Sequence, residues 1–253
     1  MARQTGPIQI VGTFGGINYY KTKNGYYARL KAVNPKYGSK AYKGYRLFRD
    51  LAAEFGRAAH AGKRLRFAFR DMIPISYAGN GGMMFDSMLR VIRSGPRGCD
   101  GGRHIRDGNL GLLEGFDFNV HSPMAKTLRA PYLSSIDYAR GRLTIAFPSF
   151  VPEEMILAPD WTTHFKIISG GAAIDFKNAS YELDMRESEF ISWGKMHTGD
   201  LKYELALTPN KNVAMFLAMR LCFYHRWPGE TYEIEGGYYD AMAVIRTEQG
   251  SVG

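Results

Sequence analysis

Apolar residues recur at steps of three or four between Tyr45 and Ile73, which predicts one amphipathic helix about eight turns long. Seven Arg and Lys residues lie mostly off the apolar stripe, so the helix is apolar on one side and cationic elsewhere. Small residues such as Gly62 would let another helix approach closely. The predicted stripe consists of Phe48, Leu51, Phe55, Ala58 or Ala59, Gly62, Leu65, Phe69 and Ile73.

The residues before this helix follow a strand pattern. Residues 7–31 predict a β-hairpin or small meander, with a tight turn at Lys23-Asn24-Gly25. In the returning strand, alternation places Tyr27, Arg29 and Lys31 on one face and Tyr26, Ala28 and Leu30 on the other. The strands are expected around Ile8, Ile10 and Phe14, at Ile17–Lys21 and at Tyr26–Lys31.

A second helix is predicted from about Met83 to Arg93, and it would form an antiparallel helical hairpin with the first. Residues 33–44 are rich in Gly, Pro and Lys and predict an exposed connector. Residues 94–111 are rich in glycine and predict a loop outside the core.

From Phe116 onward, short apolar and aromatic runs alternate with turn signals, which is typical of an antiparallel β-sandwich. The predicted fold class is α+β, with an N-terminal β-hairpin and an α-helical hairpin followed by an immunoglobulin-like sandwich. We expect three parts: a basic hairpin arm and linker (1–44), a helical hairpin with its Gly-rich loop (45–110), and the sandwich domain (111–253). The candidate strands are Tyr132–Tyr138, Arg142–Phe147, Thr163–Ser169, Ala173–Lys177, Ser180–Met185, Lys202–Leu207, Val213–Tyr224, Glu230–Ile234 and Tyr238–Arg246.

The net charge of +9 is unevenly distributed. Residues 1–110 hold 20 Lys or Arg and 6 Asp or Glu, whereas residues 111–253 hold 13 and 18. A basic front of +14 can meet phosphates, or it can meet the acidic back of −5 in another copy. The N-terminus lacks the pattern of a secretory signal, and the longest apolar run is too short to span a bilayer. We therefore expect no membrane partner and a cytoplasmic location, which includes the interior of a particle, filament or virion.

The sequence contains no pattern that predicts a catalytic or metal site. The six histidines lack zinc-ligand spacing, and there is no phosphate loop, nucleophile elbow or dinucleotide fingerprint. Cys99 and Cys222 stand far apart and predict neither a disulfide framework nor a metal site. We therefore expect no cofactor, no metal and no enzymatic activity. The remaining alternative is an enzyme with a pocket lined by His104, Arg106 and Asp107.

Two groups of residues are candidates for binding surfaces. In the basic and aromatic group, rings interleave with cations, as in platforms for single-stranded nucleic acid; alternatively, the tyrosines pack on the helix while the lysines stay solvated. The acidic group is a candidate docking patch, and its alternative is a solvated strand edge. The basic group comprises Lys21, Lys23, Tyr26, Tyr27, Arg29, Lys31, Lys63, Arg64, Arg66 and Arg70. The acidic group comprises Glu182, Asp184, Glu187 and Glu189.

The first 70 residues or so contain motifs found together elsewhere. The opening strand MARQTGPIQI, the hairpin YKTKNGYYARLK and the helix segment EFGRAAHAGKRLR stand in this order. The chain thereby resembles a widespread family of uncharacterised bacterial proteins with a MARQTGPIKI-type strand, a YKT-x-x-GYY hairpin and an EFG-x-A-x-x-A-G-K helix. The resemblance implies a shared architecture and no particular activity.

The leading functional prediction is a non-enzymatic structural protein that self-associates. Its basic N-terminal region would pack against the acidic sandwich of a neighbouring copy, which makes a homo-oligomer. The alternative is a protein that packages or coats DNA or RNA through the basic group. The two predictions are compatible, since a coat protein can do both.

Overall fold

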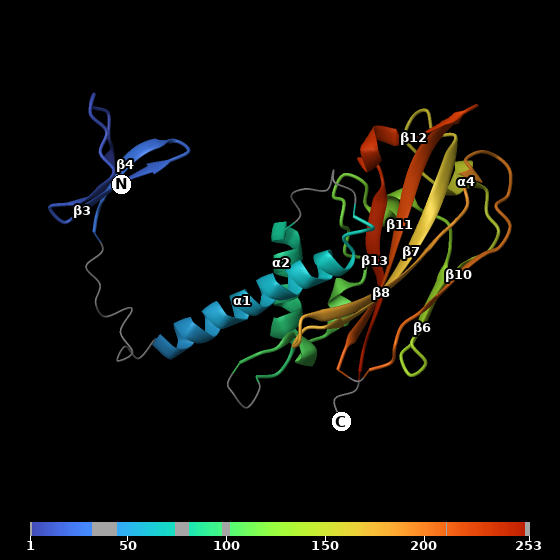
Figure 1. Ribbon diagram of the computed structural model, residues 1–253, viewed down its shortest axis with the longest axis horizontal. Helices are drawn as coiled ribbons and strands as arrows, with labels where there is room; N and C mark the ends of the chain where they lie inside the picture. Colours follow the sequence, from blue (N-terminus) through green and yellow to red (C-terminus); the bar gives the residue numbers. More distant parts are fainter. Residues whose placement is uncertain (1, 32–44, 74–80, 98–101, 211, 251–253) are drawn as a thin grey trace. The chain divides into compact units, whose positions relative to one another are not determined.

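The computed structural model describes residues 2–31, 45–73, 81–97, 102–210 and 212–250 (Figure 1). The chain divides into two compact units, Met1–Arg49 and Asp50–Gly253. Below, residues 2–31 are called the arm and residues 50–250 the body. The described residues form a mixed fold with four α-helices and 13 strands in antiparallel sheets, one of which curls into a half-barrel. The expected connector at 33–44, the turn after Pro74 and Cys99 lie outside the described residues.

The arm is a small antiparallel sheet with the strand order β1-β4-β3-β2. Its predicted turn is confirmed, since Thr22 pairs with Gly25 across Lys23 and Asn24. The expected first strand is confirmed only at Phe14, since β2 pairs Gly12–Phe14 with β3, whereas Ile8 and Ile10 lie in no strand. The side chain of Gln4 instead bonds both main-chain groups of Ile10, at 2.9 and 3.1 Å. The strands are β1 (Ala2–Arg3), β2 (Gly12–Phe14), β3 (Ile17–Thr22) and β4 (Gly25–Leu30).

Two helices confirm the predicted helical segments. Helix α1 (Tyr45–Ala68) ends before the expected Ile73, and a hydrogen-bonded turn follows it. The predicted stripe is confirmed at Leu65 and Phe69, which are fully buried, whereas Phe55 is 44% exposed. Helix α2 (Gly81–Ser94) crosses α1 closely, because a Cβ on Gly62 would lie 2.9 Å from the Met84 side chain.

The remaining strands of the body form two sheets. In the larger sheet β11 and β7 are central; β12 and β13 pair with the outer side of β11, and β8 and β9 with the outer side of β7. The smaller sheet has the order β10-β6-β5. The strands are β5 (Leu133–Asp137), β6 (Arg142–Phe147), β7 (His164–Asp175), β8 (Ser180–Glu187), β9 (Ile191–Ser192), β10 (Leu201–Ala206), β11 (Ala214–Trp227), β12 (Glu230–Glu233) and β13 (Ala241–Gln249). The short helices are α3 (Met124–Thr127) and α4 (Pro152–Met155).

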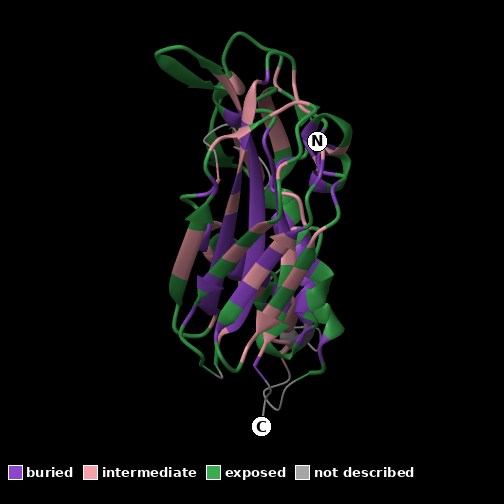
Figure 2. Cartoon of the chain, turned by 90° about the vertical axis from the view of Figure 1, so that its right-hand side faces the viewer, coloured by how far each residue is buried: buried purple, intermediate pink, exposed green. Residues whose placement is uncertain are grey.

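Alternating side chains of β11 enter two separate cores. Met215, Leu217 and Leu221 pack toward the smaller sheet, while Phe216 and Ala218 pack toward α1 and α2. The central strands are accordingly the most buried part of the body (Figure 2). The larger sheet is thus covered by a second sheet on one face and by helices on the other. The immunoglobulin-like arrangement is not confirmed, and the expected division near residue 110 does not separate two units, because helices and sheet share a core.

Two further expectations are corrected. Residues 94–111 are not outside the core, because the 3-10 turns η2 (Ile105–Asp107) and η3 (Leu110–Leu113) bury Ile105 and Leu110 under the helices. The two strands expected at 163–169 and 173–177 are one strand, β7. It continues through Gly170 and Gly171, which pair with Ala218 and Leu217 of β11. Glycine suits both positions because a Cβ would crowd a core side chain, Met72 on one face and Leu143 on the other.

We expect Gly170→Ala to lower the free energy of unfolding by about 1–3 kcal/mol, because the added Cβ would lie 2.1 Å from the Met72 Sδ in a filled core. Urea denaturation followed by circular dichroism measures this change. Gly194→Ala is the control, since nothing lies within 4 Å of its added Cβ. Equal stability of the two variants would contradict the close packing of α1 on β7.

Candidate functional site

The arm has no core of its own. None of residues 2–31 is buried. Its large apolar side chains are mostly in the open: Phe14 and Leu30 are each 81% exposed, Ile8 79% and Val11 64%. An isolated sheet with so little burial is marginally stable in water. The arm therefore exposes a surface that another layer can cover.

The strand register gives the arm two unlike faces. Paired residues of adjacent antiparallel strands point to the same side, and neighbours along a strand point to opposite sides. The first face is apolar and aromatic except for one lysine, and the second is polar and cationic. The apolar face carries Phe14, Ile17, Tyr19, Lys21, Tyr26, Ala28 and Leu30. The polar face carries Arg3, Thr13, Asn18, Tyr20, Thr22, Tyr27 and Arg29.

Rings and cations contact one another on the polar face. Tyr20 and Tyr27 stack with ring centroids 6.2 Å apart, and the Arg29 guanidinium lies 5.3 Å from the Tyr20 ring. Lys21 makes the corresponding contact with Tyr26 on the apolar face, at 5.3 Å. Residues 2–31 contain no carboxylate, so the cations of the arm form no ion pair within the arm. Lys23 lies in the turn and Lys31 directly after β4.

The other predicted cations belong to the body. Lys63 is exposed on α1, and Arg66 is partly buried there. Arg70 follows α1, where it pairs with Asp71 at 3.4 Å and lies 4.4 Å from the Phe67 ring. Arg64 lines a cavity. The basic group predicted from the sequence therefore divides into an arm set and a body set.

The predicted acidic patch has structural contacts within its own chain. Glu182 and Asp184 on β8 accept hydrogen bonds from the main-chain amides of Thr208 and Ala206, each at 2.9 Å. Glu187 pairs with Lys166 at 2.7 Å, and Glu189 is exposed. The bonds of Glu182 and Asp184 join β8, in the larger sheet, to the end of β10 in the smaller sheet. Sequence reasoning could not show this, since the two strands become neighbours only in the folded chain.

An aromatic surface at the far end of β11 was missed by sequence reasoning. Trp161, Trp227 and Tyr232 are 82%, 69% and 53% exposed. All three meet His225, which bonds the Trp161 carbonyl oxygen at 2.8 Å, stacks on Trp227 and pairs with Tyr232 across β12. Trp161 has a left-handed backbone with φ 68°, which is strained for a bulky residue. We call Trp161, His225, Trp227 and Tyr232 the aromatic end.

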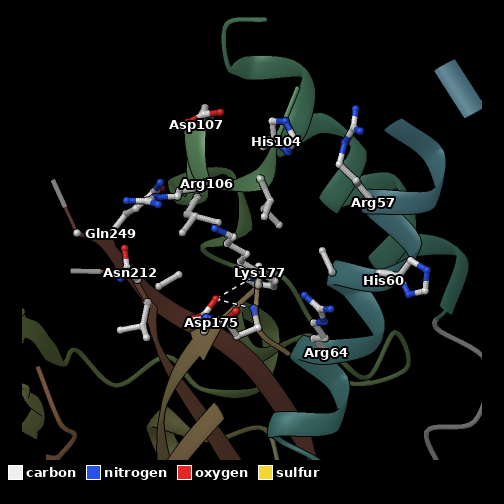
Figure 3. A pocket seen from close by; sticks show the side chains of 18 residues that line it. Arg57, His60, Arg64, His104, Arg106, Asp107, Asp175, Lys177, Asn212 and Gln249 are labelled. Atoms are coloured by element: carbon white, nitrogen blue, oxygen red, sulfur yellow. Dashed lines mark hydrogen bonds between the residues drawn. The ribbon is translucent and has the colours of Figure 1, made fainter. Parts of the chain in front are cut away.

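A cavity of about 660 Å³ lies in the body between α1, the 102–110 segment and the β7–β8 turn (Figure 3). Arg57 and Arg64 line it from α1, Arg106 from η2 and Lys177 from the turn. His104, Arg106 and Asp107, the residues named for a possible pocket, do line this cavity. Apolar side chains, among them Phe176 and Val213, form part of its wall.

One group, buried except for Glu233, has metal-ligand atoms close together. The sulfur of Cys222 and carboxylate oxygens of Glu233 and Asp240 lie within 4.8 Å of one another. Both carboxylates already bond Arg220, at 2.6 Å each, and burial raises the pKa of the Cys222 thiol. A guanidinium among these ligands and a protonated thiol do not suit a metal ion. The group is a structural ion-pair network.

Arg220 joins three parts of the body. Besides Glu233 and Asp240, it donates to the main-chain oxygen of Met72 at 3.2 Å, next to the end of α1. Asp240 is fully buried and also accepts from the amide of Phe223. Burial raises the pKa of Asp240 to about 6, and the charge of Arg220 opposes this shift. The carboxylate therefore depends on Arg220 to remain ionised at neutral pH.

Comparison with family models, with curated proteins and with solved structures yields no match to this chain. Among the described helices, none combines the length and the apolar character that crossing a membrane requires.

We expect Arg220→Met to lower the free energy of unfolding by about 3–5 kcal/mol at pH 8, because it leaves Asp240 buried without a partner. The folded-state pKa of Asp240 already lies above the ordinary 3.8, so its ionisation opposes folding above about pH 6. Without Arg220, ionisation of the buried Asp240 costs more free energy of folding. At pH 5 Asp240 can be protonated, so the stability difference between Arg220→Met and the unchanged protein should be smaller there than at pH 8. Urea denaturation at the two pH values measures it.

The control is Lys202→Met, which breaks an exposed ion pair of the same 2.6 Å length with Glu204. This change should cost about 0–1 kcal/mol. An Arg220→Met deficit that is equal at pH 5 and pH 8 would contradict the role given to Asp240.

Proposed function

We propose that this protein is a non-enzymatic assembly protein in which the arm of one copy packs its apolar face against the body of a second copy. One observation carries the proposal: the arm sheet has an apolar face, yet none of residues 2–31 is buried. A sheet with one apolar face is stable when a second layer covers that face. A second copy of the chain supplies such a layer and makes the protein a homo-oligomer.

The aromatic end of the body is the surface that suits the arm best. Its exposed rings match the rings and aliphatic side chains of the arm's apolar face, as in the centre of protein interfaces. Two exposed carboxylates in the stretch 228–240 beside it, Glu230 and Glu235, are not among the Arg220 contacts, and the stretch has no Lys or Arg, whereas residues 1–31 contain five Lys or Arg and no carboxylate. The predicted patch on β8 suits the arm less, because three of its four carboxylates bond their own chain.

Contact between two different surfaces has a consequence for symmetry. An arm that binds the aromatic end of the next copy forms a head-to-tail contact, which generates a ring when the rotation closes and a filament when it does not. The facing sheets, for which we retain the immunoglobulin-like arrangement as a proposal, would be the rigid part of each subunit. We propose a cytoplasmic location, within such a particle or filament.

We expect the double variant Phe14→Ser/Leu30→Ser to weaken self-association by about 100-fold or more, because each removed side chain contributes about 1.5–3 kcal/mol when buried. Trp227→Ser on the aromatic end should weaken it as well. Sedimentation velocity of the full chain over a range of concentrations measures the association. Leu133→Ser/Met196→Ser is the matched control, since these body residues are 77% and 80% exposed and should leave the association unchanged.

Three results would count against assembly. One is a monomer at high protein concentration in both low and high salt. Another is a monomer whose arm amides are protected from hydrogen exchange, because the arm would then be covered by its own body. The third is an equal effect of the arm variant and its control.

Binding of single-stranded nucleic acid is a second candidate, which the polar face of the arm favours. Stacked Tyr20 and Tyr27 with Arg29 beside them supply rings and a cation on one surface. Bases stack on such rings while cations neutralise phosphates. Because this face is opposite to the apolar one, the two functions can be tested separately.

We expect Arg3→Gln/Arg29→Gln to weaken binding of a single-stranded oligonucleotide and to reduce the slope of log affinity against log salt by about 0.7 for each lost phosphate contact. Fluorescence anisotropy at several salt concentrations measures both. Phe14→Ser/Leu30→Ser, on the opposite face, is the control and should leave the affinity of the monomer unchanged. Absence of binding at low salt would eliminate this candidate.

A further inference from the structure

The cavity in the body carries an excess of positive charge. Arg57, Arg64, Arg106 and Lys177 line it, against the two carboxylates of Asp107 and Asp175. Asp175 is fully used by the β7–β8 turn, where it accepts from the amides of Lys177 and Asn178 and from the Asn178 side chain, at 2.7–3.0 Å. Although burial alone raises it, these hydrogen bonds hold the pKa of Asp175 below its ordinary value, with a contribution from Arg64. Asp175 therefore stays ionised, and its carboxylate oxygens are used by hydrogen bonds within its own turn.

Arg57 has unused hydrogen-bonding capacity in this cavity. Its Nε and Nη2 atoms are buried and have no hydrogen-bond partner among the described residues. Glu54, one helical turn before it, pairs through Oε1 with Arg103 at 3.3 Å; its Oε2 lies 3.9 Å from Arg93 and makes no hydrogen bond among the described residues, to Arg57 or to any other. A buried charged donor without a partner is costly, and an anion with oxygen acceptors would relieve that cost.

The remaining lining indicates more than a small inorganic anion. Ile105, Leu110, Phe176 and Val213 contribute apolar surface between the cations. Arg57 and Arg64 are seven residues apart on α1, which separates their backbone positions by about 10 Å along the helix axis. A volume of about 660 Å³ falls within the range of small-molecule sites, about 300–1,000 Å³.

We propose that this cavity binds a small phosphorylated molecule with an apolar or aromatic ring, of the size of a nucleotide. Arg57 and Arg64 from α1 bind its phosphate oxygens, Lys177 adds positive charge from the β7–β8 turn, and the apolar wall contacts the ring (Figure 3). Every lining residue belongs to the body, so this site does not depend on the proposed assembly through the arm.

Calorimetric titration of the full chain with a panel of ribonucleoside mono- and triphosphates, and with inorganic phosphate, tests the site. At least one nucleotide should bind, and more tightly than inorganic phosphate. Arg57→Gln and Arg64→Gln should each weaken that binding about tenfold to 100-fold, as expected for the loss of a hydrogen bond to a charged group. Lys63→Gln is the matched control: it removes the same charge from the next position on α1 but from outside the cavity lining, and should change the affinity less than twofold.

Four results would overturn the proposal. The first is no binding of any panel member at millimolar concentration. The second is equal affinity for inorganic phosphate and for every nucleotide, which would exclude a role for the apolar wall. The third is equal weakening by Lys63→Gln and Arg64→Gln, which would indicate diffuse surface attraction. The fourth concerns Arg57→Gln: because Nε and Nη2 of Arg57 have no hydrogen-bond partner among the described residues, the melting temperature of this variant without ligand should not fall, and a clear fall would indicate a structural role.

Discussion

Strand β11 is buried along ten consecutive residues, Ala214–Phe223, so an apolar layer has to cover each of its faces. The smaller sheet covers one face and the helices α1 and α2 cover the other. Arg220 is the exception within this run, and its guanidinium is held by Asp240, Glu233 and the oxygen of Met72. The same residue thus satisfies a buried charge and connects the strand to the end of α1. The body is a layered unit whose packing is determined by this strand.

The arm, unlike the body, has no buried residue. Its four strands have an apolar face like those of the body, but the arm sheet by itself buries none of its residues. Its outer strands are only two and three residues long, which limits edge-to-edge pairing. The face, and not the edge, is therefore the surface that a partner can cover. The contrast between a body with its own core and an arm without one is the reason for assigning assembly to the arm.

Cations of the chain serve at least three different purposes. Lys21 and Arg29 of the arm stand beside tyrosine rings in a segment without carboxylates, whereas Arg220 is neutralised within the body. Arg57 and Arg64 face a cavity whose main carboxylate, Asp175, is bonded to its own turn. One overall net charge therefore conceals local environments with different chemistry. A basic composition alone could not distinguish a polymer-binding surface from a small-molecule site.

The sequence by itself determined the local elements: α1, α2, most strands and the two faces of β4 in the arm, because periods of 3.6 and two residues depend on neighbours in the chain. It could not show that β7 continues through Gly170 and Gly171, since these glycines pair with β11 and leave room for Met72 and Leu143, which come from distant parts of the chain. Nor could it show that Glu182 and Asp184 join two sheets, or that five separate segments enclose a cavity. Only the tertiary structure decided these features, because each arises from contacts between residues far apart in sequence, to which short-range patterns are insensitive.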